Sequence, residues 1–231
     1  MSSSAPPSGS PARTAAEREL LERAVHDLKN PLAVVRASLE WLEVELTGRE
    51  EALDAVRDAT SAADRLLTLV DDLDVLARLG EGGVASGGTA AIVPLVISVV
   101  SGASTRLARR GVTVEVKDPY TGRPLETTGD GRILARSLTA LVDYTSRGAP
   151  IGACVEVRVA EAVSASGGRE VEIGIALRGT VEAAPSELGF DRHERTNLGV
   201  YVARRVVEAH RGSIELVPTA SLPRVVVRLP A

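Results

Sequence analysis

Two rows of apolar residues, each with a seven-residue period, run through the start of the chain. One row holds Leu21, Leu28, Val35 and Leu42, and the other holds Val25, Leu32, Leu39 and Leu46. Because such positions recur on one side of a helix, the pattern predicts one long helix of the coiled-coil type. Gly48 is suited to ending that helix.

A second run keeps the same spacing and ends before Gly80. Its members are Val56, Ala59, Ala63, Leu66, Val70, Leu73 and Ala77. Two long helices joined by a short turn predict a helical hairpin. A lone hairpin cannot cover apolar rows of this length, whereas two hairpins paired as a four-helix bundle can, so we expect a homodimer. The alternative is a hairpin that packs on the C-terminal half of its own chain.

Changes in composition predict two domains. Residues 1–12 consist largely of Ser, Pro, Gly and Ala and are expected to be disordered. The hairpin domain is expected over 13–80, and glycine-rich residues 81–89 are typical of a linker. Residues 90–231 are expected to form the second domain.

The sequence of the second domain contains both helix and strand patterns. Periodicity and turn residues predict helices at 92–110, 132–147 and 199–210, and strands at 112–116, 154–160, 170–177, 213–217 and 224–229. Helices and antiparallel strands in this order favour an α+β two-layer sandwich.

The overall composition excludes several classes of protein. Aromatic residues make up 2% of the chain, so the core must consist of Leu, Val, Ile and Ala. A net charge of −4 argues against a nucleic-acid surface. The single cysteine, Cys154, excludes an internal disulfide and a cysteine-rich zinc site. With no apolar run near the roughly 20 residues of a membrane helix and no signal peptide, we expect a cytoplasmic protein without a membrane partner.

The chain has three histidines, which differ in their surroundings. His210 precedes Arg211-Gly212 at a helix end, where it can satisfy last-turn carbonyl groups. His193 lies in the charged stretch FDRHER and is expected to be solvated. His26 follows Val25 of the apolar row, so it is expected beside the packed stripe rather than in it.

His26 is the candidate nucleophile. Asp27 could accept a proton from one ring nitrogen and leave the other free to attack. Asn30, four residues later on the same helix face, could orient a water molecule or a phosphoryl oxygen. From these residues alone, a solvated surface histidine beside an aspartate remains the alternative.

Several segments resemble those of sensor histidine kinases. HDLKNPL (26–32) resembles the H box, which carries the phosphorylated histidine in the dimerisation and phosphotransfer domain, and residues 62–79 resemble the second helix of that domain. RRGVTVEV (109–116), residues 197–216 and RVVVRLPA (224–231) resemble parts of the ATP-binding domain, in the family's order. The resemblance implies a dimeric four-helix bundle followed by an ATP-binding domain of this type.

The ATP site departs from the family pattern at the magnesium-holding position and in the first glycine box. Where the family has a magnesium-holding Asn, this chain has Asp143, whose oxygens could still bind a hard cation. Where the family's first glycine box has an adenine-reading Asp, the chain has Leu177, followed by Gly179 and Val181. Leucine cannot accept that hydrogen bond, and an unpaired buried donor costs roughly 1–3 kcal/mol.

The second glycine box departs as well. Asn197 stands where a glycine would be, while Gly199 is kept. The intervening loop, 182–196, is shorter than a usual ATP lid. Since several changes fall on one ligand, we interpret the domain as a degenerate kinase ATP-binding domain, with Asp143, Leu177, Gly179, Asn197 and Gly199 as vestigial site positions.

The resemblance implies that the chain is a histidine phosphotransferase of a two-component phosphorelay. It would move phosphoryl groups between His26 and the receiver-domain aspartates of response regulators without ATP, since an acyl phosphate is already activated. Lys29 could help to neutralise the phosphoryl oxygens. No cofactor or bound metal is expected, and Mg²⁺ would come with the receiver.

Two other functions stay open. One is an ATP-dependent histidine autokinase with a divergent pocket that uses Asp143 for magnesium. The other is a non-catalytic pseudokinase scaffold that never carries phosphate.

Overall fold

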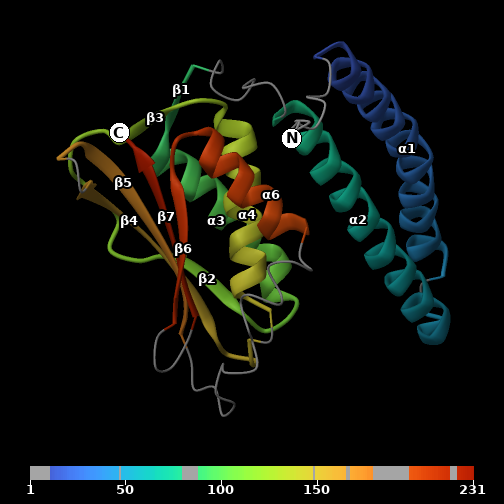
Figure 1. Cartoon of the computed structure of the whole chain (residues 1–231). Coiled ribbons are helices and arrows are strands. Elements are labelled where there is room, and N and C mark those ends of the chain that lie inside the picture. Colours follow the sequence, from blue (N-terminus) through green and yellow to red (C-terminus); the bar gives the residue numbers. More distant parts are fainter. Residues whose placement is uncertain are drawn as a thin grey trace, which may run out of the picture. The chain divides into compact units, whose positions relative to one another are not determined.

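The computed structural model describes residues 11–46, 48–79, 88–147, 149–164, 167–178, 198–218 and 223–231. Contacts divide the chain into two compact units, Met1–Gly80 and Glu81–Ala231, which we treat separately (Figure 1). Of the segment expected to be disordered, residues 1–10 lie outside the described residues, and the first helix begins at Pro11. Residues 81–87 of the expected linker also lie outside them.

The first unit is the predicted helical hairpin, made of α1 (Pro11–Glu45) and α2 (Glu50–Leu79) (Figure 1). The two helices contact each other along the hairpin. Gly48 lies in the turn with φ = 90°, a backbone conformation that side chains other than glycine rarely adopt. The prediction that Gly48 terminates the first helical run is confirmed.

One heptad row of each helix is covered within the hairpin, and we call these positions the inner row. On α1, Val25 is buried and the following members are half-buried; on α2, all members are buried. The inner row consists of Val25, Leu32, Leu39, Leu46, Val56, Ala63, Val70 and Ala77.

A second row stays open in the single chain, and we call it the outer row. It consists of Leu28, Val35, Leu42, Ala59, Leu66 and Leu73. Leu28, Val35 and Leu66 are each nearly half exposed, at 48%, 47% and 49%. One hairpin therefore leaves a continuous apolar stripe in contact with water, as the heptad count predicts.

The second unit is built on a five-stranded mixed sheet with the strand order β2-β4-β5-β7-β6. The strands are β2 (Thr113–Val116), β4 (Cys154–Val163), β5 (Arg169–Arg178), β6 (Ser213–Pro218) and β7 (Pro223–Pro230). Helices α3 (Ile92–Ala108), α4 (Gly131–Thr145) and α6 (Leu198–Ala209) lie on one face of it (Figure 1). This is the predicted two-layer arrangement.

Apolar and polar side chains alternate along the strands, which explains why the helices cover one face of the sheet. On β5, Val171, Ile173 and Ile175 face the helices and are fully buried, while Glu172 points to the other face. The helices contribute Leu, Val and Ala from their inner sides. None of the aromatic side chains in the described ranges is fully buried, which agrees with a core predicted from aliphatic residues.

Two features of the sheet differ from the sequence prediction. Strand β2 pairs parallel to β4, so the expectation of antiparallel strands throughout is wrong for this pair. A parallel pair needs a long crossover, and the chain between β2 and β4 contains α4. The short strands β1 (Thr89–Ala91) and β3 (Glu126–Thr128) pair antiparallel and were not predicted, because three residues each give no measurable alternation.

The predicted structural role of His210 is confirmed. The residue follows α6 and is 4% exposed, and its Nδ1 donates a hydrogen bond to the Val206 carbonyl oxygen at 2.7 Å. It therefore satisfies a last-turn carbonyl group of the helix. His193 lies outside the described residues.

A polar cluster joins the β4–β5 hairpin to the loop that precedes β3. The Glu161 carboxylate on β4 accepts hydrogen bonds from the Arg169 guanidinium on β5 and from the Tyr120 hydroxyl, the latter at 3.2 Å. The Arg169 hydrogen bond lowers the pKa of Glu161 below its ordinary value of 4.5. Arg169 also donates to the Pro124 carbonyl oxygen at 3.4 Å.

Replacing Glu161 by glutamine should therefore destabilise the second unit in a pH-dependent way. A carboxyl group with a lowered pKa in the folded state stabilises the fold above its unfolded pKa, and this stabilisation is lost as the pH falls through the folded pKa. We expect E161Q to unfold at lower urea concentration than the wild type at pH 7, with the difference disappearing in acid. Urea titrations from pH 7 to pH 3 would measure it, with E170Q on the same hairpin as control. A difference that persists unchanged at pH 3 would contradict the assignment.

Candidate functional site

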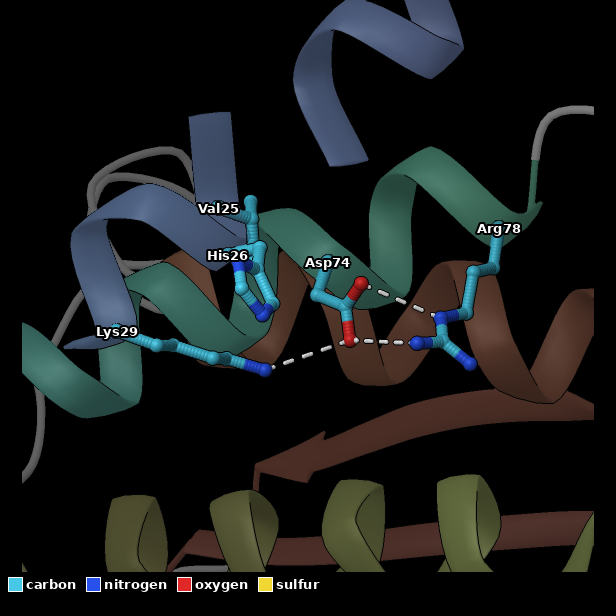
Figure 2. A pocket seen from close by; sticks show the side chains of 5 residues that line it. All are labelled: Val25, His26, Lys29, Asp74 and Arg78. Atoms are coloured by element: carbon cyan, nitrogen blue, oxygen red, sulfur yellow. Dashed lines mark hydrogen bonds and ion pairs between the residues drawn. The ribbon is translucent and has the colours of Figure 1, made fainter. Parts of the chain in front are cut away.

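A pocket of about 380 Å³ opens on the hairpin between the middle of α1 and the C-terminal end of α2. Its lining consists of Val25, His26, Lys29, Asp74 and Arg78 (Figure 2). The antiparallel hairpin brings these segments together, because α2 runs back along α1 from the turn that follows Glu45. Three of the five lining residues carry charged side chains, and a histidine ring lies among them.

His26 projects from the edge of the packed surface. The preceding residue, Val25, is 3% exposed, whereas the His26 side chain is 74% exposed, because successive helical residues point about 100° apart. The ring is directed into the pocket that Lys29 and Asp74 also line (Figure 2). A partner protein can therefore reach the ring without opening the hairpin.

The Asp27 carboxylate approaches the His26 ring. Its Oδ1 lies 3.6 Å from His26 Nδ1, which is within ion-pair range and slightly too long for a hydrogen bond. Since Asp27 approaches Nδ1, the geometry leaves Nε2 as the ring nitrogen that can meet a reaction partner. A small side-chain rotation would close the contact with Asp27.

Lys29 lines the same pocket and is paired with carboxylates of α2. Its Nζ lies 2.8 Å from Asp71 Oδ1. It also lies 3.5 Å from Asp74 Oδ2 (Figure 2). The cation predicted to neutralise phosphoryl oxygens thus stands beside His26 but is held by two negative charges. The pairs are partly exposed, so each contributes little to stability and can rearrange.

Arg78 is a second cation of the pocket, and sequence reasoning missed it. Its Nε and Nη2 contact the two carboxylate oxygens of Asp74 at 3.2 Å and 3.1 Å (Figure 2). The inner row could have revealed it. Ala77 and Val25 are both buried members of this row, and antiparallel pairing of the helices places the residues around position 77 opposite those around position 25. Extending that register predicts Arg78 near His26.

Asn30 is not among the lining residues of the pocket. It is exposed on α1, one turn beyond His26. The structure therefore brings His26 together with Lys29, Asp74 and Arg78, while Asn30 lies on the adjoining surface.

At the magnesium position implied by the family resemblance, Asp143 of α4 is bound by an arginine. The Arg106 Nη2 of α3 donates to both carboxylate oxygens, at 3.0 Å and 3.3 Å. Within the described ranges, moreover, no group of three or more His, Cys, Asp or Glu side chains is arranged to hold a metal ion.

The other positions of the implied nucleotide site divide into two groups. Leu177, where the family has an adenine-reading carboxylate, is 6% exposed and belongs to the apolar core. Gly199 lies in the first turn of α6. Gly179 and Asn197 lie outside the described residues, as does the loop 182–196.

No helix in the described part of the chain combines the length and the apolar character needed to cross a membrane.

Comparison with known sequences gives a consistent result. Residues 16–82 match the His Kinase A (phospho-acceptor) domain. The chain is 26% identical to a probable sensor histidine kinase, TcrY, of Mycobacterium tuberculosis, over 95% of the chain and 47% of the relative. It is 23% identical to the sensor protein KdpD of Clostridium acetobutylicum, over 87% of the chain and 23% of the relative. The chain thus spans about half or less of these relatives.

Solved structures share the fold. Full-length ShkA, crystallised in complex with AMPPNP, superposes with a TM-score of 0.62 and 22% identity over 92% of this chain and 46% of that one. The histidine kinase AdeS of Acinetobacter baumannii gives a TM-score of 0.55 and 18% identity, over 89% of this chain and 97% of AdeS. The likeness extends over both units.

The phospho-acceptor match contains the whole His26 pocket, and the curated relatives align along nearly the entire chain. The resemblance suggested by the sequence motifs is therefore confirmed: residues 16–82 match the phospho-acceptor domain of histidine kinases, and the chain as a whole is similar to sensor histidine kinases.

Proposed function

We propose that this chain is a histidine phosphotransferase that exchanges phosphoryl groups between His26 and receiver-domain aspartates without ATP. One observation carries the proposal: an exposed histidine ring faces a pocket with two cations, inside the segment that matches a phospho-acceptor domain. The exposure suits docking by a folded receiver domain. The cations suit an incoming phosphoryl group.

The transfer step uses the two ring nitrogens differently. Nδ1, beside Asp27, keeps its proton, and the lone pair of Nε2 attacks the phosphorus of the receiver's aspartyl phosphate. A P–N bond forms while the acyl P–O bond breaks, and its electron pair stays on the receiver's carboxylate. Asp27 stabilises the positive charge that develops on the ring. Any Mg²⁺ that the step needs would come with the receiver.

Lys29 and Arg78 would stabilise the phosphoryl oxygens during this step. Both line the pocket of His26, and both side chains are long enough to turn from their carboxylate partners toward a group on the ring. Charge-assisted hydrogen bonds of this kind are roughly twice as strong as neutral ones.

The outer row supports a dimeric four-helix bundle as the working form. Its exposed leucine and valine side chains form an apolar stripe that a second copy of the hairpin would cover. His26 lies outside that row, so the bundle would leave its ring open to a receiver.

Two observations favour transfer without ATP over the autokinase. The Asp143 carboxylate is engaged by Arg106, and Leu177 is packed in the core. A magnesium nucleotide needs oxygen ligands and an adenine acceptor, and these described positions fit it poorly.

Phosphotransfer from a radiolabelled receiver tests the proposal directly. The wild-type protein, incubated with phosphorylated receiver domains of the same genome and no ATP, should become labelled, and H26Q should carry no label because it has no nucleophilic ring nitrogen. The label should be stable in base and labile in acid, as a phosphoramidate is.

Two results would overturn the proposal. Labelling of His26 from radioactive ATP alone, without a receiver, would favour the autokinase. Binding of a phosphorylated receiver without any transfer of label would favour the scaffold.

The dimer is tested by placing a charge in the outer row. L66D should weaken self-association by about 100-fold, since each of the two copies would carry a buried charge into the interface. Sedimentation can measure this. V44D, on an exposed position outside both rows, is the matched control. Equal association of L66D and wild type would contradict the bundle.

A further inference from the structure

One carboxylate holds both cations of the His26 pocket. Asp74 contacts Lys29 at 3.5 Å and Arg78 at 3.1 Å and 3.2 Å, and its side chain is 18% exposed (Figure 2). It is the single acidic residue among the pocket's lining residues in the described part of the chain. Whatever approaches His26 through the pocket therefore meets the two cations with this negative charge already between them.

The charges make Asp74 a competitor of a phosphoryl group. A phosphoryl group on His26 carries negative charge into the same small volume and would draw on Lys29 and Arg78 for hydrogen bonds. It would also stand a few ångströms from the Asp74 carboxylate, and like charges at such distances repel each other in a partly desolvated pocket.

We infer that Asp74 is a positioning residue that weakens the hold of the pocket on the phosphoryl group of His26, so that the group stays transferable. This inference rests on the proposed phosphotransfer and deepens it. A pocket with two unopposed cations would stabilise phosphohistidine so strongly that transfer of the phosphoryl group to a receiver would become unfavourable. With Asp74 present, the outgoing transfer returns Lys29 and Arg78 to their carboxylate partner, which offsets the contacts that they lose.

The step itself conserves its atoms in both directions. Outward transfer breaks the P–N bond at His26 Nε2 and forms a P–O bond to the receiver's aspartate, and the electron pair of the broken bond returns to the ring nitrogen. Asp74 takes no part in bond formation. It changes the equilibrium between phosphohistidine and aspartyl phosphate through the charge that it places beside the cations.

The variant D74N tests this inference, because asparagine keeps the shape and removes the charge. At equilibrium with a phosphorylated receiver, the ratio of phosphohistidine to aspartyl phosphate should rise by about tenfold over the wild type, the change expected for one charge pair at this range. D74E keeps the charge and should give a ratio of phosphohistidine to aspartyl phosphate close to that of the wild type. D71N removes a carboxylate that contacts Lys29 but does not line the pocket, so its effect on the ratio should be clearly smaller.

A second measurement does not depend on the receiver. Binding of inorganic phosphate to the full chain, followed by the NMR shifts of the His26 ring, should be about tenfold tighter in D74N than in the wild type. The double variant D74N/R78Q should lose this gain, because the gain requires the released guanidinium. Circular dichroism spectra would verify that all variants keep the helical hairpin.

The outcomes separate the two proposals. Wild type that takes no label from any receiver, with phosphate binding still tighter in D74N, would overturn the phosphotransferase function and leave the electrostatic role of Asp74 supported. Wild type that takes label, with D74N unchanged in both measurements, would overturn the role of Asp74 alone. An equal effect of D71N and D74N would also overturn it, since it would reveal a general effect of net charge.

Discussion

The register between α1 and α2 determines the site. The inner row, from Val25 to Ala77, fixes which part of one helix meets which part of the other, and Asp74 and Arg78 reach His26 only in that register. A slip by one heptad keeps the apolar match but moves the facing residues by about 10 Å along the helix axis. The two cations would then stand beside a different turn of α1. Packing of plain aliphatic side chains thus sets the chemistry of a charged pocket.

The hairpin separates its structural and reactive surfaces around the axis of α1. Val25 is buried in the inner row, and Leu28 belongs to the outer row, about 60° away around the helix. His26 lies about 100° from Val25 in the opposite direction, so its ring projects from the flank of the inner row that faces away from the outer row. A bundle that buries the outer row and a receiver that approaches the pocket would use different sides of the same helix, so dimerisation and transfer need not compete.

The local parts of this structure follow from the sequence, and the distant pairings do not. Heptad spacing predicts the hairpin, Gly48 its turn, and alternation predicts the buried side of β5. The parallel pairing of β2 with β4 depends on a crossover that no local pattern records. The same limit explains why Arg78 was missed while Lys29 was found: Lys29 lies one turn from His26, whereas Arg78 depends on the inter-helix register.

If the second unit has lost its nucleotide-binding groups, as we propose, its core does not depend on that ligand. Leu177 adds an apolar side chain to that core, and the Arg106 guanidinium neutralises Asp143 from within the protein. Arg110 strengthens the same junction, donating to the Ser146 carbonyl oxygen at 2.9 Å. Helices α3 and α4 are thereby joined by two arginines near their C-terminal ends, where carbonyl groups and carboxylates attract cations. The Asp143 carboxylate and the Ser146 carbonyl group are thus satisfied by neighbouring side chains of the protein itself, which ties α3 to α4.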